Sequence, residues 1–126
     1  MSYRPHHIHL MSHDAMVAGA YYERMFGATL ERSQGANGLP RANLHLGDQF
    51  ILISTVTESV TQEAGGPHSV LGLDHIGIAV EDMPSAIADL ESKGAEFIMK
   101  PPDGKGRIAF LKGPDSVSIE LVQVGS

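Results

Sequence analysis

The stretches PHHIHL at residues 5–10 and LDHIGI at residues 73–78 decide the fold, because they carry one pattern twice. His7 in the first and His75 in the second are each followed seven residues later by an aspartate. Matching residues recur further along the chain at an offset of 66–68 residues, as in the pairs Gly27 and Gly94 or Arg41 and Arg107. An internal repeat of this length indicates two copies of one structural unit. It also gives the two histidines equivalent positions, which a pseudo-symmetric structure can bring together.

Each copy predicts a strand, a helix and three further strands, since a period-2 alternation is followed by a helical pattern between an aspartate and a glycine. The expected strands are 7–11, 28–33, 41–46, 49–56, 73–80, 95–100, 107–112 and 117–124, and the helices follow Asp14 and Asp82. We therefore expect an α+β protein of two tandem βαβββ modules, residues 1–56 and 73–126, joined by a linker at residues 57–72. Neither module is expected to bury its sheet alone, so both should form one structural domain, a curved mixed sheet around a metal-binding cleft.

The composition excludes several classes of function. The chain has 126 residues, of which 42% are hydrophobic and 19% charged, as in a folded globular domain. Its net charge of −6 argues against a nucleic-acid partner. No apolar run approaches the ~20 residues that cross a bilayer, so we expect no membrane segment and a cytoplasmic location. Cysteine is absent, and any metal must therefore be bound through nitrogen and oxygen atoms.

Three residues in the expected strands could bind such a metal. His7 and His75 lie in the first strand of each unit, among apolar residues that make an unbonded histidine costly. Glu120 lies in the middle of the last strand, with valines following it on its own face. Two imidazoles and one carboxylate match a facial triad for a first-row divalent metal. The alternative is that both histidines are hydrogen-bonded core residues and Glu120 is a solvated edge residue.

Several motifs together carry a resemblance to a known family. They are the His-Ile-x-Leu strand before Asp14, YYERMFG at 21–27, DHIGIAV at 74–80, and IAF, GPD and IEL at 108–110, 113–115 and 119–121. In this order they resemble the vicinal oxygen chelate superfamily over nearly the whole chain. That superfamily includes glyoxalase I, methylmalonyl-CoA epimerase, fosfomycin-resistance transferases, extradiol dioxygenases and bleomycin-binding proteins. The resemblance implies one divalent metal ion in the cleft, chelated by adjacent oxygens of a small-molecule substrate.

The resemblance also implies where the ligands lie, namely on the first and last strands of each unit. His7, His75 and Glu120 match three of the four positions, and the ion could be Mn, Fe, Co, Ni or Zn. Counting from Asp48 as from its counterpart in the second unit places the fourth ligand at Ile53, or at Ser54 if an insertion shifts the count. Neither residue is a good ligand, so this chain departs from the glyoxalase pattern.

The implied function is a lyase or isomerase of the glyoxalase I/epimerase type, acting on a small chelating substrate through a metal-stabilised enediolate. One alternative is a three-ligand His-His-Glu enzyme, either a fosfomycin-resistance transferase or an Fe(II) extradiol dioxygenase. Another is a non-catalytic protein of the bleomycin-resistance type that binds a drug or metabolite.

Other residues are candidates for substrate chemistry. His9 faces the same side as His7 and is the candidate acid/base in place of the missing carboxylate. Lys105 and Arg107 could bind a substrate anion. No role is assigned to the remaining histidines, which are His6, His13, His45 and His68. A homodimer is expected, because members of the superfamily build their clefts within one chain or between two.

Overall fold

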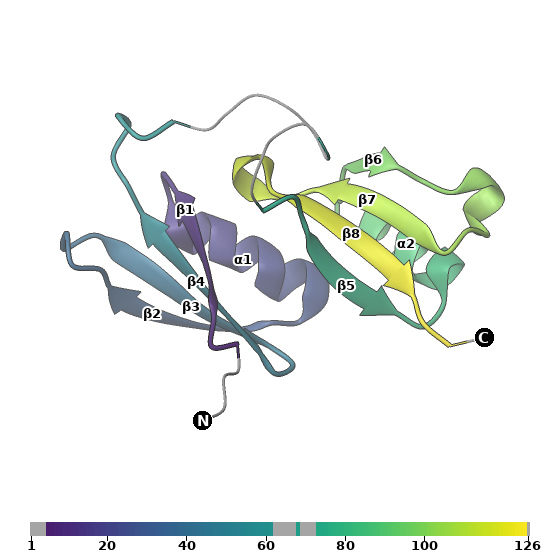
Figure 1. Ribbon diagram of the computed structural model, residues 1–126, viewed down its shortest axis with the longest axis horizontal. Coiled ribbons are helices and arrows are strands. Elements are labelled where there is room, and N and C mark those ends of the chain that lie inside the picture. The colour runs from purple at the N-terminus through teal and green to yellow at the C-terminus, as the bar shows by residue number, and fades with distance from the viewer. Residues whose placement is uncertain (1–4, 62–67, 69–72, 126) are drawn as a thin grey trace. The chain divides into compact units, whose positions relative to one another are not determined.

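The computed structural model describes residues 5–61, 68 and 73–125, and the chain divides into two compact units, Met1–Thr61 and Gln62–Ser126 (Figure 1). The first unit contains β1 (Ile8–Ser12), α1 (Ala15–Phe26), β2 (Thr29–Gln34), β3 (Pro40–Leu46) and β4 (Gln49–Thr55). The second contains β5 (Ile76–Val80), α2 (Met83–Ser92), β6 (Phe97–Met99), β7 (Ile108–Lys112) and β8 (Ser118–Gln123). The α+β class and the repeated βαβββ order are confirmed. Residues 62–67 and 69–72 of the predicted linker lie outside the described residues, and one shared structural domain stays a prediction.

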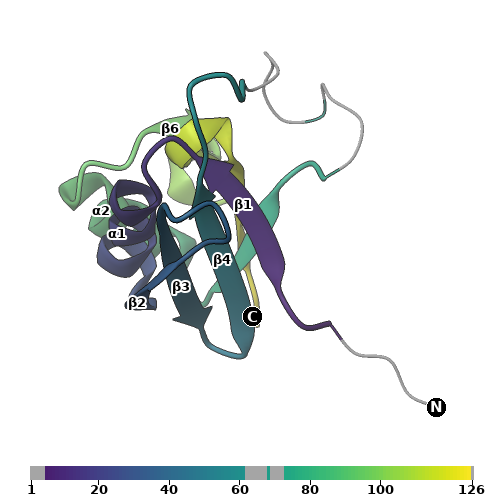
Figure 2. The ribbon, with the colours of Figure 1, turned by 90° about the vertical axis from the view of Figure 1, so that its left-hand side faces the viewer.

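The first sheet has the strand order β1-β4-β3-β2, in which β1 runs parallel to β4 and the other pairs are antiparallel. Figure 2 shows β1 beside β4, with α1 against the sheet. Asp14 caps α1 by accepting the Val17 main-chain N–H at 3.2 Å. Gly27 ends the helix with a φ of 75°, a conformation that favours glycine. The predicted helix boundaries are therefore confirmed by the caps that motivated them.

Alternation along the strands separates two faces of this sheet. Leu44, Ile51 and Ile53 are at most 1% exposed and form the core with α1. His9 and Leu52 are register partners on the opposite face, which α1 does not cover. His9 thus lies on the face that is free of the helix.

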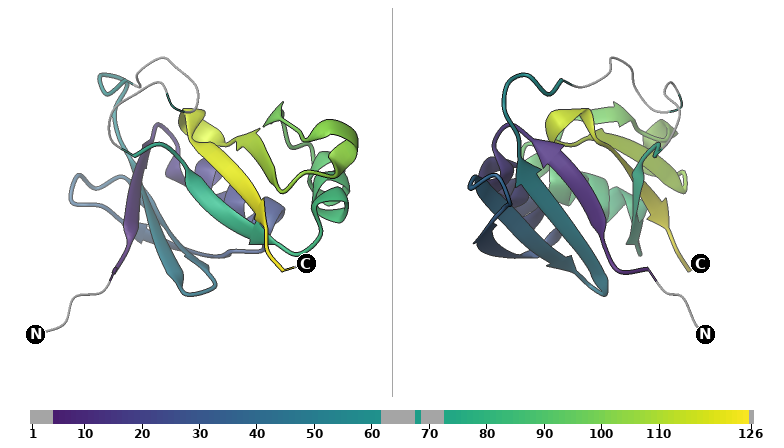
Figure 3. Two further views of the ribbon diagram at one scale, coloured as in Figure 1. Left: turned by 45° about the vertical axis from the view of Figure 1, so that its right-hand side comes forward. Right: turned by 60° about the vertical axis from the view of Figure 1, so that its left-hand side comes forward.

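The second unit repeats the arrangement with the order β5-β8-β7-β6 (Figure 3). Its first strand along the chain, β5, again runs parallel to its last, β8. Asp82 caps α2 by accepting the Ser85 main-chain N–H at 3.0 Å. Ile119 and Leu121 are fully buried beneath α2, whereas Glu120 between them points to the other face and is only half-buried. The predicted alternation of β8 is confirmed. It places the carboxylate on the face without a helix.

The structure also departs from the predicted boundaries. β5 begins at Ile76 rather than Leu73, and β6 keeps only Phe97–Met99 because its pairing with β7 shifts register there. Two short 3₁₀ turns, Pro102–Gly104 and Pro114–Ser116, occupy segments where no helical turn was predicted. Within the described part of the chain, no helix is long and apolar enough to cross a membrane.

Candidate metal centre

His75 and Glu120 lie on the same face of the second sheet. His75 immediately precedes β5, and Gly77, two residues further on, is the register partner of Glu120 in β8. Side chains two residues apart on an extended chain point to the same side. A Cβ at Gly77 would meet nothing within 4 Å, so no described side chain of the unit fills the space beside the carboxylate at this position.

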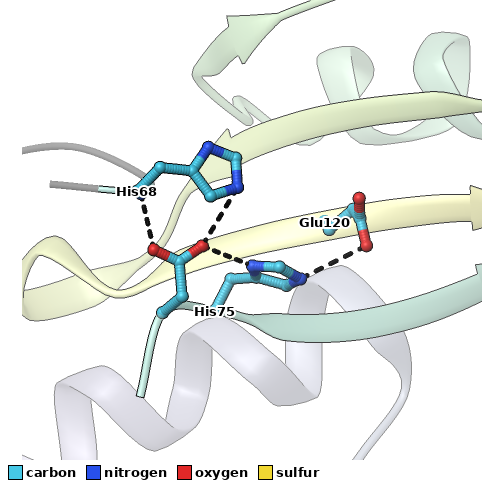
Figure 4. A network of polar contacts seen from close by, with 4 residues as sticks. His68, His75 and Glu120 are labelled. Carbon is cyan, nitrogen blue, oxygen red and sulfur yellow. Dashed lines mark hydrogen bonds and ion pairs between the residues drawn. The ribbon is translucent and has the colours of Figure 1, made fainter. Parts of the chain in front are cut away.

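The two nitrogens of His75 have different partners, as Figure 4 shows. Nδ1 lies 2.7 Å from Oδ2 of Asp74, and Nε2 lies 3.3 Å from Oε1 of Glu120. The side chains of His75, Asp74 and Glu120 are 28%, 26% and 18% exposed, so each is partly buried and still reachable by an ion. His75 is therefore held between two carboxylates.

These two distances indicate different kinds of contact. A separation of 2.7 Å between Nδ1 and Oδ2 of Asp74 is that of a charge-assisted N–H···O hydrogen bond. Ligand atoms bound at about 2.1 Å to one ion lie about 3.0 Å apart at a right angle and about 3.4 Å apart at a tetrahedral angle. The 3.3 Å between Nε2 of His75 and Oε1 of Glu120 falls within that range. The His75–Glu120 pair therefore fits two ligands of one metal, and the His75–Asp74 pair does not.

The hydrogen bond to Asp74 also selects the tautomer of His75. A proton on Nδ1 leaves the lone pair on Nε2, the nitrogen that faces Glu120. The hydrogen bond from His75 lowers the pKa of Asp74, with a smaller contribution from the main-chain N–H of His68, so the acceptor stays ionised at neutral pH. A carboxylate behind a ligating histidine orients the ring and makes it a stronger ligand.

The structure adds His68, which the sequence left without a role. Its main-chain N–H donates to Oδ1 of Asp74 at 2.5 Å, and its Nε2 lies 3.3 Å from Oδ2. His68, Asp74 and His75 each offer a possible ligand atom within 4.8 Å of one another. The 2.7 Å between Nδ1 of His75 and Oδ2 of Asp74 is shorter than the about 3.0 Å expected between two ligands of one ion, so a metal bound through these two atoms would have to move them apart. The acid directly before His75 could have identified the Asp74–His75 contact from the sequence, but no sequence signal marks His68.

The remaining histidine candidates lie in the first unit. His7 immediately precedes β1 as His75 precedes β5, and it is exposed, with its Nδ1 2.8 Å from Nδ1 of His6. His9 is also exposed, and its Nε2 lies 2.7 Å from the Ser54 hydroxyl. The equivalence of His7 and His75 is thus reproduced locally in the two units.

The residue of the first unit that is equivalent to Glu120 is neither Ile53 nor Ser54, the two positions predicted from the sequence. His9 is equivalent to Gly77, and their register partners are Leu52 and Glu120, so Leu52 is the residue of the first unit that is equivalent to Glu120. Ile53 points instead into the core and is 1% exposed. The prediction assumed loops of equal length in the two units. Five residues, 113–117, lie between the paired residues Lys112 and Ser118 of β7 and β8. Only four, 46–49, lie between the equivalent pair His45 and Phe50 of β3 and β4. An apolar side chain stands where a fourth ligand would be.

The two candidates for anion binding lie around β7. The Arg107 guanidinium donates to the main-chain carbonyls of Gln123 and Gly125, at 2.7 and 3.0 Å, and thereby holds the chain after β8. Lys105 is exposed next to the Pro102–Gly104 turn. A role of either residue in substrate binding stays a prediction.

Comparison with known proteins identifies the family of this chain. The sequence profile of the glyoxalase/bleomycin resistance protein/dioxygenase superfamily matches residues 6–111. The chain belongs to this superfamily. This match confirms the resemblance to the vicinal oxygen chelate superfamily. Glyoxalase I of Leishmania major and the fosfomycin-resistance protein FosX are among the structural neighbours, which shows that the chain shares their fold.

Three relatives show how far the superfamily likeness extends. The uncharacterized protein YaeR of Escherichia coli is 29% identical over 122 residues, 94% of each chain. Lactoylglutathione lyase GLX1 of Arabidopsis thaliana is 27% identical over 113 residues, 83% of this chain but 38% of that enzyme. A mutant of FosX from Listeria monocytogenes, crystallised with Mn(II) and 1S,2S-dihydroxypropylphosphonic acid, matches with a TM-score of 0.77 at 18% identity, covering 99% of this chain and 95% of FosX. At that identity the structural match establishes the shared fold.

Proposed function

We propose that this chain is a divalent-metal-dependent enzyme, with Nε2 of His75, the carboxylate of Glu120 and the imidazole of His7 as ligands. The observation that supports the proposal most strongly is the arrangement of His75, whose Nδ1 is hydrogen-bonded to Asp74 while its Nε2 lies 3.3 Å from Glu120. Imidazole and carboxylate suit Mn, Fe, Co, Ni and Zn alike, so the donor set leaves the ion open. An ion bound there supplies Lewis-acid stabilisation of negative charge on substrate oxygens.

The third ligand of the proposal comes from the first unit. His7 is equivalent to His75 in the repeat, and both immediately precede the first strand of their unit. It could come from the same chain or from a second copy, and the proposed homodimer rests on this alternative. The cytoplasmic location also stays a prediction.

The reaction that we propose is that of a lyase or isomerase, in which a base removes a proton beside a carbonyl. His9 is the proposed base, because it lies next to Leu52, the position equivalent to Glu120. When Nε2 of His9 donates to the Ser54 hydroxyl, 2.7 Å away, Nδ1 can accept the substrate proton. The hydroxyl holds the ring in both protonation states, since Nε2 keeps its proton and donates to the hydroxyl oxygen in each.

Leu52 favours a second candidate function. Without a carboxylate at the fourth position, the proposed donor set has three ligands, as in the fosfomycin-resistance type of this superfamily. An enzyme of that type opens an epoxide: a thiol or water bonds to one ring carbon as its C–O bond breaks, the ring oxygen takes up the nucleophile's proton, and no proton is removed from carbon. The structural likeness to FosX shows the shared fold, and the reaction remains a proposal.

Proton exchange followed by ¹H NMR in D₂O separates the two reactions. The metal-loaded protein is given, in parallel, the glutathione–methylglyoxal hemithioacetal or fosfomycin together with glutathione as the nucleophile. A lyase or isomerase converts the first and incorporates deuterium, and His9→Gln should slow this by at least about 100-fold while retaining the metal. His45→Gln is the matched control, because His45 is another exposed histidine on the same sheet face. Loss of the epoxide signals without exchange would favour the second function, and no turnover of either substrate would count against both.

A further inference from the structure

We infer that His68 is a positioning residue for the metal ligand His75, acting through its main-chain N–H and the carboxylate of Asp74. The inference rests on the proposed function, because it assigns His75 to the metal. Asp74 connects the two histidines: Oδ1 accepts the His68 N–H at 2.5 Å, and Oδ2 accepts from Nδ1 of His75 at 2.7 Å (Figure 4). With one oxygen fixed by the main chain, the other is turned toward His75.

The backbone of His68 supports a specific role for its N–H. His68 has a φ of 67°, in the left-handed region that residues other than glycine rarely adopt. Such a conformation persists only where surrounding contacts favour it. The hydrogen bond from this N–H to Asp74 is such a contact, and the unusual φ directs the N–H toward the carboxylate.

Aromatic contacts also connect the two histidines. Phe110 in β7 is 8% exposed, and it is the register partner of Glu120. Its ring meets the His75 ring edge-on at 5.4 Å and the His68 ring at 5.8 Å. Asp74 and Phe110 thus each contact both histidines, so a displacement of His68 is transmitted to His75.

The imidazole of His68 is assigned the smaller part. It is 70% exposed, and its Nε2 lies 3.3 Å from an Asp74 oxygen that already accepts the shorter bond from His75. The main-chain N–H is therefore expected to matter more than the ring. Substitutions that affect one and spare the other can separate the two contributions.

The test compares His68→Pro with His68→Gly in the full chain. Proline removes the N–H and cannot adopt a positive φ, whereas glycine keeps the N–H and adopts this φ freely. Co²⁺ affinity is measured by calorimetric titration, and the His75 tautomer is read from the ¹⁵N imidazole spectrum of the metal-free protein. Glu58→Pro is the control, because Glu58 is exposed in the segment after β4 and its main-chain N–H makes no hydrogen bond within the described residues.

His68→Pro should weaken Co²⁺ binding by about tenfold, as expected on losing an outer partner of a ligand, and should mix the His75 tautomers. His68→Gly and the control should stay within about threefold of the wild type and keep the proton on Nδ1. If His68→Pro fails to fold, His68→Val replaces it, because a branched side chain also disfavours a positive φ. Wild-type affinity and tautomer in His68→Pro would overturn the inference, as would an equal loss in His68→Gly. If the wild type binds no Co²⁺, the proposed function fails, and the tautomer spectra alone decide the inference.

Discussion

Gly19 lies in the middle of α1, and for its replacement by alanine, helix propensity and packing have opposite effects on the free energy of unfolding. Replacing a helical glycine with alanine normally stabilises a protein by about 0.5–1 kcal/mol, because glycine loses more backbone entropy on folding. In this chain, a Cβ at Gly19 would lie 2.9 Å from Cβ of Ala42 and 3.0 Å from Cδ1 of Leu30. Favourable carbon–carbon contacts begin at about 3.5 Å.

The structure indicates that packing dominates. The Leu30 methyl group can move, but the Cβ of Ala42 is fixed to the backbone of β3 and Ala42 is fully buried. Overpacking of this kind typically costs about 1–3 kcal/mol. Subtracting the middle of the helix-propensity range from the middle of the overpacking range leaves a net destabilisation of about 1 kcal/mol, and each kcal/mol should lower the melting temperature by about 3–6 °C.

Thermal unfolding of Gly19→Ala, Ala42→Gly and the double variant, followed by circular dichroism, tests this reasoning. The double variant should be more stable than the sum of the single effects predicts, because removing the Ala42 Cβ relieves the contact. Gly19→Ala melting at or above the wild-type temperature, or additive single effects, would refute the close approach of α1 to the sheet.

Three further predictions concern the second unit. Asp74→Asn should weaken divalent-metal binding about 10–100-fold in calorimetric titrations. Asp82→Asn, the same substitution at a helix cap, is the control and should leave metal binding unchanged. Equal effects of the two substitutions would contradict the assigned role of Asp74. The hydroxyl and main-chain N–H of Ser85 lower the pKa of Asp82 below its ordinary 3.8, so its stabilising effect is present above that pH and is lost as the pH falls through the folded-state pKa. The difference in melting temperature between the wild type and Asp82→Ala should therefore shrink as the pH falls below about 4, and a constant difference would exclude the charge contribution. Leu121→Ala should destabilise the protein by about 2–5 kcal/mol in urea unfolding, because Leu121 is fully buried, and a loss no greater than that of Val124→Ala, at a site 45% exposed, would contradict this.

Much of the fold can be predicted from local sequence patterns, namely the helix caps and the alternation along the strands. Asp14 and Asp82 predict both helix starts, because an aspartate side chain that accepts a main-chain N–H needs no tertiary information. The alternation around Glu120 predicts which face of β8 it occupies, since the period of a strand depends on the chain alone.

The site is predictable only in part, because some of its geometry depends on loops. Ile53 is not the equivalent of Glu120 because the β7–β8 connection is one residue longer than the β3–β4 connection. The aspartates of the two connections, Asp48 and Asp115, do not reveal this difference. The role of His68 could not be predicted, because its contact with Asp74 depends on a positive φ. The presence of a histidine in the sequence gives no indication of that conformation. The roles of His7, His9 and Glu120 in binding and catalysis stay predictions.

The most direct test of the proposed metal centre is elemental analysis of protein purified without a histidine tag and reloaded with one divalent metal at a time. Wild type, His75→Ala and Glu120→Ala are compared, with Glu96→Ala as a control because Glu96 is a solvent-exposed carboxylate of the same unit. We expect about one equivalent of a first-row divalent ion in the wild type and the control, and its loss in the other two variants. No bound metal under any loading condition, or undiminished metal in folded His75→Ala and Glu120→Ala, would contradict the account.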